Sequence, residues 1–259
     1  MIKAVFVDFD GTLCSFKTHR VPPSAVEAMR RARARGVRLV LATGRHTLFA
    51  DEAAPFEPYP FDGYIGINGQ LCHLPGGEVI FSQPLDSGDV RRLLENCGRL
   101  GIPCSMVGLR RTVVTAVDDR VRRFNESIGL PPPPVGRPEE LEGGIFSLMP
   151  YMYAGEEAAV MEGLRHSAAM RWSPLAADIV PSSGGKHVGM QRFLDYFGLA
   201  REECMALGDG ENDISMLRLA GIGVAMGGGL PEVLAAADVV APAPEEDGFC
   251  RILEQYGVI

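Results

Sequence analysis

The residues of this chain with the clearest capacity for chemistry are two aspartates near its start. Asp8 and Asp10 follow the apolar run at 5–7, which has the β-branched and aromatic content of a buried strand. Because ligands of open α/β sheets bind beyond the carboxyl ends of parallel strands, we expect both carboxylates in a ligand site. Two neighbouring carboxylates repel each other and lose solvation, and a bound cation would offset that cost. An Asp-Gly dipeptide also begins ordinary turns, so this segment alone leaves a structural interpretation open.

Further polar residues follow other apolar runs. Thr43 comes after the run at 37–42, and Asp209 comes after the run at 204–207. In a doubly wound sheet such strand ends meet at one edge, so these side chains can converge. Gly44 has no side chain, which lets backbone N–H groups approach an anion. The set is completed by residues at the starts of two later helices, Lys186 in one and Asn212 and Asp213 in the other.

Carboxylates, one lysine, one hydroxyl and one amide together predict a phosphate site assembled with Mg²⁺. This ion prefers octahedral oxygen ligands from one or two carboxylates, waters and the substrate phosphate. Asp8 and Asp209 are the candidate side-chain ligands, and Asp10 could contribute its backbone carbonyl. Lys186 and Thr43 could hold the transferring oxygens by positive charge and by a hydroxyl donor.

The same residues indicate covalent catalysis by a carboxylate. The chain contains no GxxxxGK[ST] loop, which disfavours a P-loop kinase, and no histidine is placed as a nucleophile. Asp8 is then the expected attacker, forming an aspartyl-phosphate. We expect the neighbours of Asp10 to keep it partly protonated. It would be the general acid for the leaving oxygen and later the base for water.

The segments that must position these residues alternate between strands and helices at both ends of the chain. Strands are predicted at 37–45 and 64–70, with a helix at 24–36 whose start carries a capping box of Ser24 and Glu27. The middle differs: helices are predicted at 87–101, 119–130 and 155–167, a hairpin at 103–109 with 111–117, a strand at 144–153 and mostly strand at 171–180. This order predicts an α/β core with a parallel sheet, split by an α+β insertion.

Composition excludes several classes of partner. The 259 residues are 46% hydrophobic and 22% charged, as in ordinary globular proteins, and the net charge is −8. A chain this acidic lacks the general basic surface that nucleic acid or anionic lipid requires, so neither partner is expected. The six cysteines show no metal-ligand spacing, and the N-terminal apolar run is too short for a signal peptide. We therefore expect a cytoplasmic protein with reduced thiols.

Four segments in sequence order resemble the motifs of a known family. DFDGTL, LATGR, the lone Lys186 and GDGENDISML closely resemble the four motifs of the haloacid-dehalogenase-like (HAD) hydrolase superfamily. The chain is similar to its Cof-type members, whose type IIB cap is inserted between the second and third motifs. The resemblance implies a Rossmann-like core at 1–82 and 181–259, a mobile α+β cap for substrate specificity at 83–180, Mg²⁺ and phosphate-ester hydrolysis. By residue it implies a nucleophile at Asp8, an acid/base group at Asp10, phosphate ligands at Thr43, Gly44, Lys186 and Asn212, metal ligands at Asp8, Asp10 and Asp209, and support from Asp213.

The expected function is hydrolysis of a small phosphorylated metabolite, such as a sugar phosphate or a phosphorylated cofactor. A phosphotransferase or phosphomutase would use the same aspartyl-phosphate, and a non-catalytic regulatory binder is the alternative from another class. Arg45 is expected to pair with a carboxylate rather than with substrate. The segment Asn68-Gly69 either forms only a turn or lines the pocket, and Trp172 is expected in the core or an interface. The sequence does not predict the oligomeric state.

Overall fold

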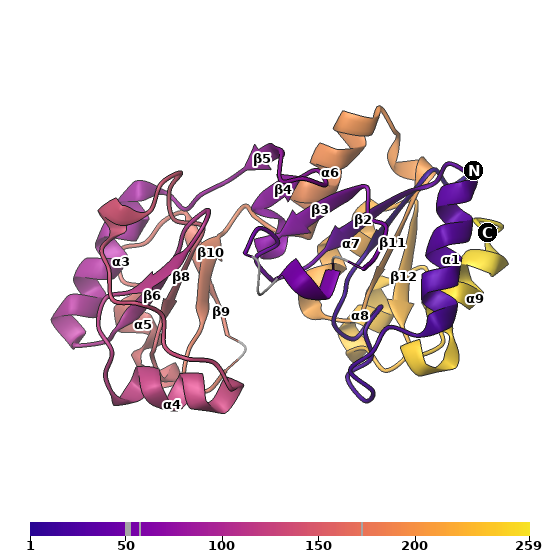
Figure 1. The fold of residues 1–259 in the computed structure, drawn as a ribbon. Coiled ribbons are helices and arrows are strands. Elements are labelled where there is room, and N and C mark those ends of the chain that lie inside the picture. The colour runs from indigo at the N-terminus through magenta and orange to yellow at the C-terminus, as the bar shows by residue number, and fades with distance from the viewer. Residues whose placement is uncertain (50–52, 57, 172) are drawn as a thin grey trace. The chain divides into compact units, whose positions relative to one another are not determined.

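The computed structural model describes residues 1–49, 53–56, 58–171 and 173–259, so Trp172 lies outside the described residues. The chain divides into two compact units (Figure 1). The first contains Met1–Ser82 and Gly185–Ile259, and the second contains Gln83–Gly184. Each unit has its own sheet and its own buried apolar clusters.

The first unit is built on an eight-stranded sheet in the order β13-β12-β11-β1-β2-β3-β4-β5. The first six strands in this order, from β13 to β3, are parallel to one another. At the β3 edge, β4 pairs antiparallel with β3 and β5 pairs antiparallel with β4. The α/β class predicted from the sequence is confirmed, whereas the edge hairpin was not predicted. The strands are β1 (Ala4–Val7), β2 (Arg38–Ala42), β3 (Gly63–Gly66), β4 (Leu71–His73), β5 (Val79–Ser82), β11 (Cys204–Gly208), β12 (Ile222–Met226) and β13 (Val239–Ala241).

Helices cover both faces of this sheet, because successive strand residues point to opposite sides. In β1, Val5 and Val7 pack in the cluster that contains the buried faces of α1 (Pro23–Ala34) and α9 (Gly248–Gln255). Ala4 and Phe6 pack in the opposite cluster, with α6 (Lys186–Phe197), α7 (Ile214–Leu219) and α8 (Pro231–Ala236). A strand buried on both faces explains the continuous apolar run that precedes Asp8.

The start of α1 differs from the prediction. Pro22 is its N-cap and Pro23 its first residue, and no side chain caps the helix, so the predicted capping box is wrong. Proline suits this position because its fixed φ matches the helix and it has no N–H to leave unsatisfied. The Ser24 hydroxyl donates instead to Asp247 Oδ1 at 2.5 Å, which ties α1 to the segment before α9.

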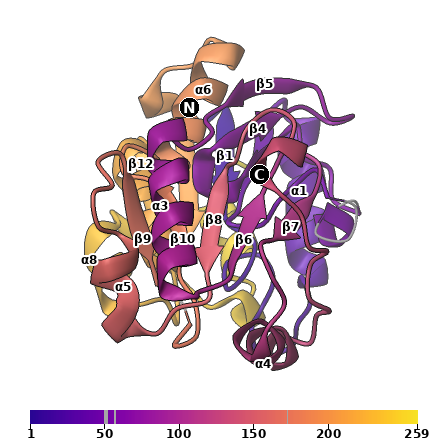
Figure 2. The ribbon, with the colours of Figure 1, turned by 90° about the vertical axis from the view of Figure 1, so that its left-hand side faces the viewer.

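The second unit is a five-stranded antiparallel sheet in the order β7-β6-β8-β10-β9. Figure 2 shows α3 lying across this sheet, where Leu93 and Cys97 pack with Met106 and Leu148. The α4 helix belongs to a separate small cluster. The elements are α3 (Ser87–Leu100), β6 (Cys104–Val107), β7 (Thr112–Val114), α4 (Asp119–Ile128), β8 (Ser147–Pro150), α5 (Glu157–Val160), β9 (Ser167–Met170) and β10 (Asp178–Pro181).

Two predictions for this unit are wrong in extent. The helix expected at 155–167 is only α5, and Gly163 adopts a left-handed φ of +80° that a helix does not continue through. The stretch expected to be mostly strand begins its strand only at Asp178. Arg171 explains this difference for residues 173–176, because its Nη1 donates to the carbonyl oxygens of Ser173 at 3.0 Å and Ala176 at 3.4 Å and takes them out of strand pairing. None of the helices in the described ranges is long and apolar enough to cross a membrane.

Candidate active site

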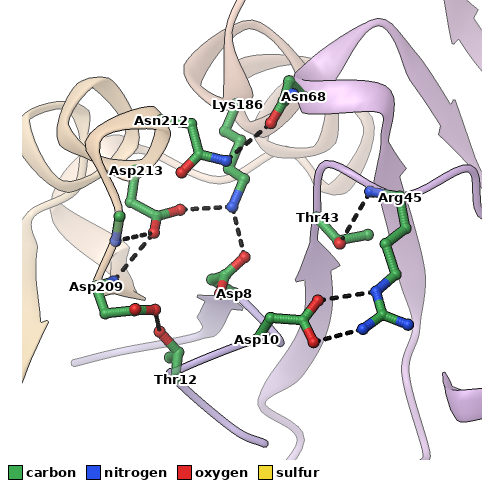
Figure 3. Close-up of polar contacts among 11 residues, drawn as sticks. Asp8, Asp10, Thr12, Thr43, Arg45, Asn68, Lys186, Asp209, Asn212 and Asp213 are labelled. Carbon is green, nitrogen blue, oxygen red and sulfur yellow. Dashed lines mark hydrogen bonds and ion pairs between the residues drawn. The ribbon is translucent and has the colours of Figure 1, made fainter. Parts of the chain in front are cut away.

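The predicted site residues of the first unit converge at the carboxyl ends of its parallel strands (Figure 3). Asp8 directly follows β1, Thr43 follows β2 and Asp209 follows β11, and these three strands are adjacent in the sheet. Lys186 is the first residue of α6, and Asp213 ends the short 3₁₀ turn Glu211–Asp213 before α7. The sheet topology therefore brings together residues as far apart in the sequence as Asp8 and Asp213.

Lys186 is the centre of the site. Its side chain is fully buried, and Nζ donates to Asp8 Oδ1 and to Asp213 Oδ1, both at 2.6 Å. The second oxygen of Asp213, Oδ2, accepts the backbone N–H groups of Asp209 and Gly210, each at 3.0 Å. Both oxygens of Asp213 therefore have hydrogen-bond partners, through which Asp213 holds the Lys186 ammonium and the turn after β11.

Asp209 is held by the loop that follows Asp8. The Thr12 hydroxyl donates to Asp209 Oδ1 at 2.7 Å. A Cβ atom on Gly11 would lie 2.2 Å from Asp209 Oδ2, and Gly11 also has a φ of +89°. Only glycine meets both conditions without displacing the carboxylate. The Gly-Thr pair of the first motif thus fixes the position of an acid about 200 residues away.

The electrostatics of the site reflect crowded negative charge. Burial would lower the pKa of Lys186, but the carboxylates of Asp213 and Asp8 outweigh burial and raise it, so the lysine stays charged. Burial raises the pKa of Asp8 well above its usual range, and the charges of Asp213 and Asp209 add to that rise against the opposing effect of Lys186. Burial likewise raises the pKa of Asp209 to about 6. One lysine therefore does not neutralise the three acids, of which Asp8 and Asp213 are buried and Asp209 is partly buried.

Asp10 has a cationic partner. Arg45 donates from Nε to Asp10 Oδ2 at 2.8 Å and from Nη2 to Asp10 Oδ1 at 2.6 Å, a two-pronged clamp drawn in Figure 3. The prediction that Arg45 pairs with a carboxylate is confirmed. The direct partner of Asp10 in this arrangement is a guanidinium, and the expectation that neighbouring groups keep Asp10 partly protonated stays a prediction. Each carboxylate oxygen of Asp10 accepts a hydrogen bond from Arg45, whereas its backbone carbonyl accepts none among the hydrogen bonds of the described residues.

Thr43 and two asparagines line the other side of the site. Thr43 is buried, and its Oγ1 accepts the backbone N–H of Arg45 at 3.2 Å. Asn212 Nδ2 donates to Asn68 Oδ1 at 2.9 Å. A Cβ atom on Gly44 would lie 3.3 Å from Asn68 Oδ1, so the backbone at Gly44 passes close to this amide pair. The segment Asn68-Gly69 therefore forms a turn, and the Asn68 side chain contacts Asn212.

The residues present fit a hard divalent cation. Carboxylate oxygens of Asp8, Asp209 and Asp213 all lie within 4.8 Å of one another. Among the hydrogen bonds of the described residues, Asp8 Oδ2 and Asp209 Oδ2 have no partner, so these two atoms are available as ligands. Oxygen donors and uncompensated negative charge are what Mg²⁺ requires.

The sequence reasoning missed Thr12, whose hydroxyl holds Asp209. Thr12 lies inside the segment DFDGTL, but its partner is 197 positions away, so nothing in the local pattern identifies the contact. For Arg45 the sequence predicted a carboxylate partner but did not identify it as Asp10.

Comparisons with known proteins agree on one family. The model of the haloacid dehalogenase-like hydrolases matches residues 5–253. The Bacillus subtilis (strain 168) protein YkrA is 27% identical over 260 residues, covering 99% of this chain and 98% of YkrA. The phosphatase BT1666 from Bacteroides thetaiotaomicron is 34% identical with a TM-score of 0.90, covering 100% of this chain and 96% of that one. The HAD subclass IIB sugar phosphatase BT4131 is 35% identical with a TM-score of 0.84, covering 99% of this chain and 100% of that one.

Proposed function

Since this chain belongs to the haloacid dehalogenase-like hydrolase family and is a phosphatase of its subclass IIB type, we propose that it hydrolyses a phosphate monoester of a small metabolite. The proposed chemistry is Mg²⁺-dependent and passes through an aspartyl-phosphate on Asp8. The substrate class we propose, a sugar phosphate or a phosphorylated cofactor, is supported by the sugar phosphatase among the similar structures.

One observation carries the proposal. Asp8 lies with Oδ1 against the buried ammonium of Lys186, while Asp209 approaches from the neighbouring strand. A charged lysine beside the nucleophile can hold a phosphoryl oxygen, and a buried charge acts more strongly on it than one in water. When bound, Mg²⁺ would be held by Asp8, Asp209 and the Asp10 carbonyl, and it would neutralise phosphoryl charge.

In the first half of the reaction, an Asp8 carboxylate oxygen attacks phosphorus. A bond forms between that oxygen and phosphorus, the bond to the leaving oxygen breaks, and Asp10 gives the leaving oxygen a proton. Lys186 and the Thr43 hydroxyl hold the transferring oxygens. In the second half, water attacks phosphorus and gives its proton to Asp10, and Asp8 departs, which releases inorganic phosphate.

The clamp on Asp10 fits the second half directly. Arg45 holds in place the Asp10 carboxylate, the group that accepts the proton from water in this half. At least one of the two hydrogen bonds from Arg45 must break before Asp10 can carry a proton to a leaving oxygen. Arg45 is half-exposed, with 41% of its side chain accessible, so it can exchange Asp10 for water.

Replacement of the nucleophile tests the proposal. Asp8→Asn should keep the circular dichroism spectrum of the wild type and lose turnover of p-nitrophenyl phosphate, because a neutral amide does not attack phosphorus. EDTA should abolish hydrolysis by the wild type, and added Mg²⁺ should restore it. Asp195→Asn, an exposed change on α6, is the matched control and should stay active. Normal turnover by Asp8→Asn would refute the nucleophile assignment, and phosphate transfer to a second added sugar would identify a phosphotransferase instead.

A further inference from the structure

The turn after β3 has an unusual backbone. Three consecutive residues have left-handed φ angles: Ile67 at +49°, Asn68 at +52° and Gly69 at +99°. Glycine adopts this region freely and asparagine tolerates it, but for a β-branched residue such as Ile67 it is a true outlier. A strained backbone of this kind persists only where the surrounding structure holds it, and such strain concentrates at functional sites.

The surroundings that hold the turn are the loops of the site. The Ile67 N–H donates to the Arg45 carbonyl at 3.0 Å, and the Asn68 N–H donates to the Thr43 carbonyl at 3.1 Å. A Cβ atom on Gly69 would lie 2.1 Å from the carbonyl oxygen of Gly185, so the turn also packs against the residue that precedes Lys186. The strained segment therefore contacts two loops that carry proposed phosphate ligands.

The Asn68 side chain reaches the third such loop. Its Oδ1 accepts the hydrogen bond from Asn212 Nδ2 at 2.9 Å, across a sequence separation of 144 residues. Figure 3 shows this amide pair beside Lys186, above Asp8. An amide has two donors and one acceptor, and its orientation is fixed only by its partners. Without Asn68, this contact would no longer hold the Asn212 amide in place.

We infer that Asn68 is a positioning residue for the phosphate site, which the left-handed turn holds in place so that its side chain orients the Asn212 amide toward the substrate phosphate. The inference rests on the proposed function and on the role of Asn212 as a phosphate ligand within it. This role accounts for the strained backbone, because a turn with ordinary φ angles would place Asn68 away from Asn212.

Replacing Asn68 by glycine tests the contribution of its side chain apart from that of the backbone conformation. Asn68→Gly keeps a residue that accepts a left-handed φ and removes the side chain with its amide. We expect it to lower kcat/KM for p-nitrophenyl phosphate about 10-fold, as loss of an orienting partner does in comparable sites, and to weaken binding of inorganic phosphate in the presence of Mg²⁺. His19→Gly is the matched control, because His19 also has a positive φ of +53° and is exposed. That variant should match the wild type.

A double-variant cycle distinguishes positioning from a merely structural role. If Asn68 acts through Asn212, then Asn68→Gly combined with Asn212→Ala should be no slower than Asn212→Ala alone. Losses that multiply, or an Asn68→Gly variant with wild-type kcat/KM and phosphate affinity, would overturn the inference while leaving the proposed function intact. A folded wild-type chain that neither hydrolyses the ester nor binds phosphate would refute the proposed function, and the inference with it.

Discussion

Asp209→Asn is expected to make the metal-free protein more stable. Asp209 lies among acids without a cation of its own, and burial together with the Asp213 charge raises its pKa from 3.8 to about 6, although Thr12 and Lys186 partly oppose that rise. Above pH 6 the wild type must keep this carboxylate ionised in an unfavourable place. An asparagine has nearly the same shape, keeps the oxygen that accepts the Thr12 hydrogen bond, and carries no charge.

The size and the sign of the effect follow from this pKa. A rise from 3.8 to about 6 corresponds to about 3 kcal/mol of lost free energy of unfolding when the group is ionised. Because the pKa is raised in the folded state, the cost is fully present above pH 6 and disappears as the pH falls below 3.8. The variant should therefore gain about 3 kcal/mol at pH 7.5, and that gain should shrink steadily toward pH 4.

Urea unfolding in EDTA at several pH values measures this difference. Mg²⁺ at 1,000 times the Kd of the wild type should then reverse the order, since it stabilises the folded wild type by about 4.1 kcal/mol, more than the gain of the variant, and the variant has lost a ligand. Glu211→Gln, an exposed neighbour, is the control and should change neither curve by more than a few tenths of a kcal/mol. A variant that is less stable than the wild type in EDTA at pH 7.5, or that gains as much from Mg²⁺, would refute the reasoning.

Two further substitutions test the contacts around the nucleophile. Lys186→Met removes the cation between Asp8 and Asp213 and leaves both carboxylates buried and unpaired, which should cost about 3–5 kcal/mol in urea unfolding at neutral pH and recover partly on acidification. Unchanged stability would argue against the buried pairing. Gly11→Ala places a methyl group 2.2 Å from Asp209 Oδ2 at a φ of +89°, so calorimetric titration should find weaker Mg²⁺ binding, and equal affinity would contradict the close approach.

Much of the core can be derived from sequence because its signals are local. An apolar run ending in Asp8, a second ending at Thr43 and a third before Asp209 each predict a buried strand with a polar end, and the structure has β1, β2 and β11 there. The rule that parallel strands gather their carboxyl ends at one edge then brings these residues together without any coordinates. Local patterns failed where tertiary contacts intervened, as for Arg171, which takes residues 173–176 out of the strand pairing that was expected there.

The sequence by itself determined which side chains stand at strand ends, because periodicity and glycine placement are properties of short segments. Only the tertiary structure decided their partners: Arg45 on Asp10, Thr12 on Asp209 and Asn68 on Asn212. Each of these pairs joins loops from different strands, and a hydrogen bond depends on fractions of an ångström that no spacing in the chain encodes. The left-handed turn at Asn68 belongs to the same class, since three surrounding loops, not its own residues, hold it in that conformation.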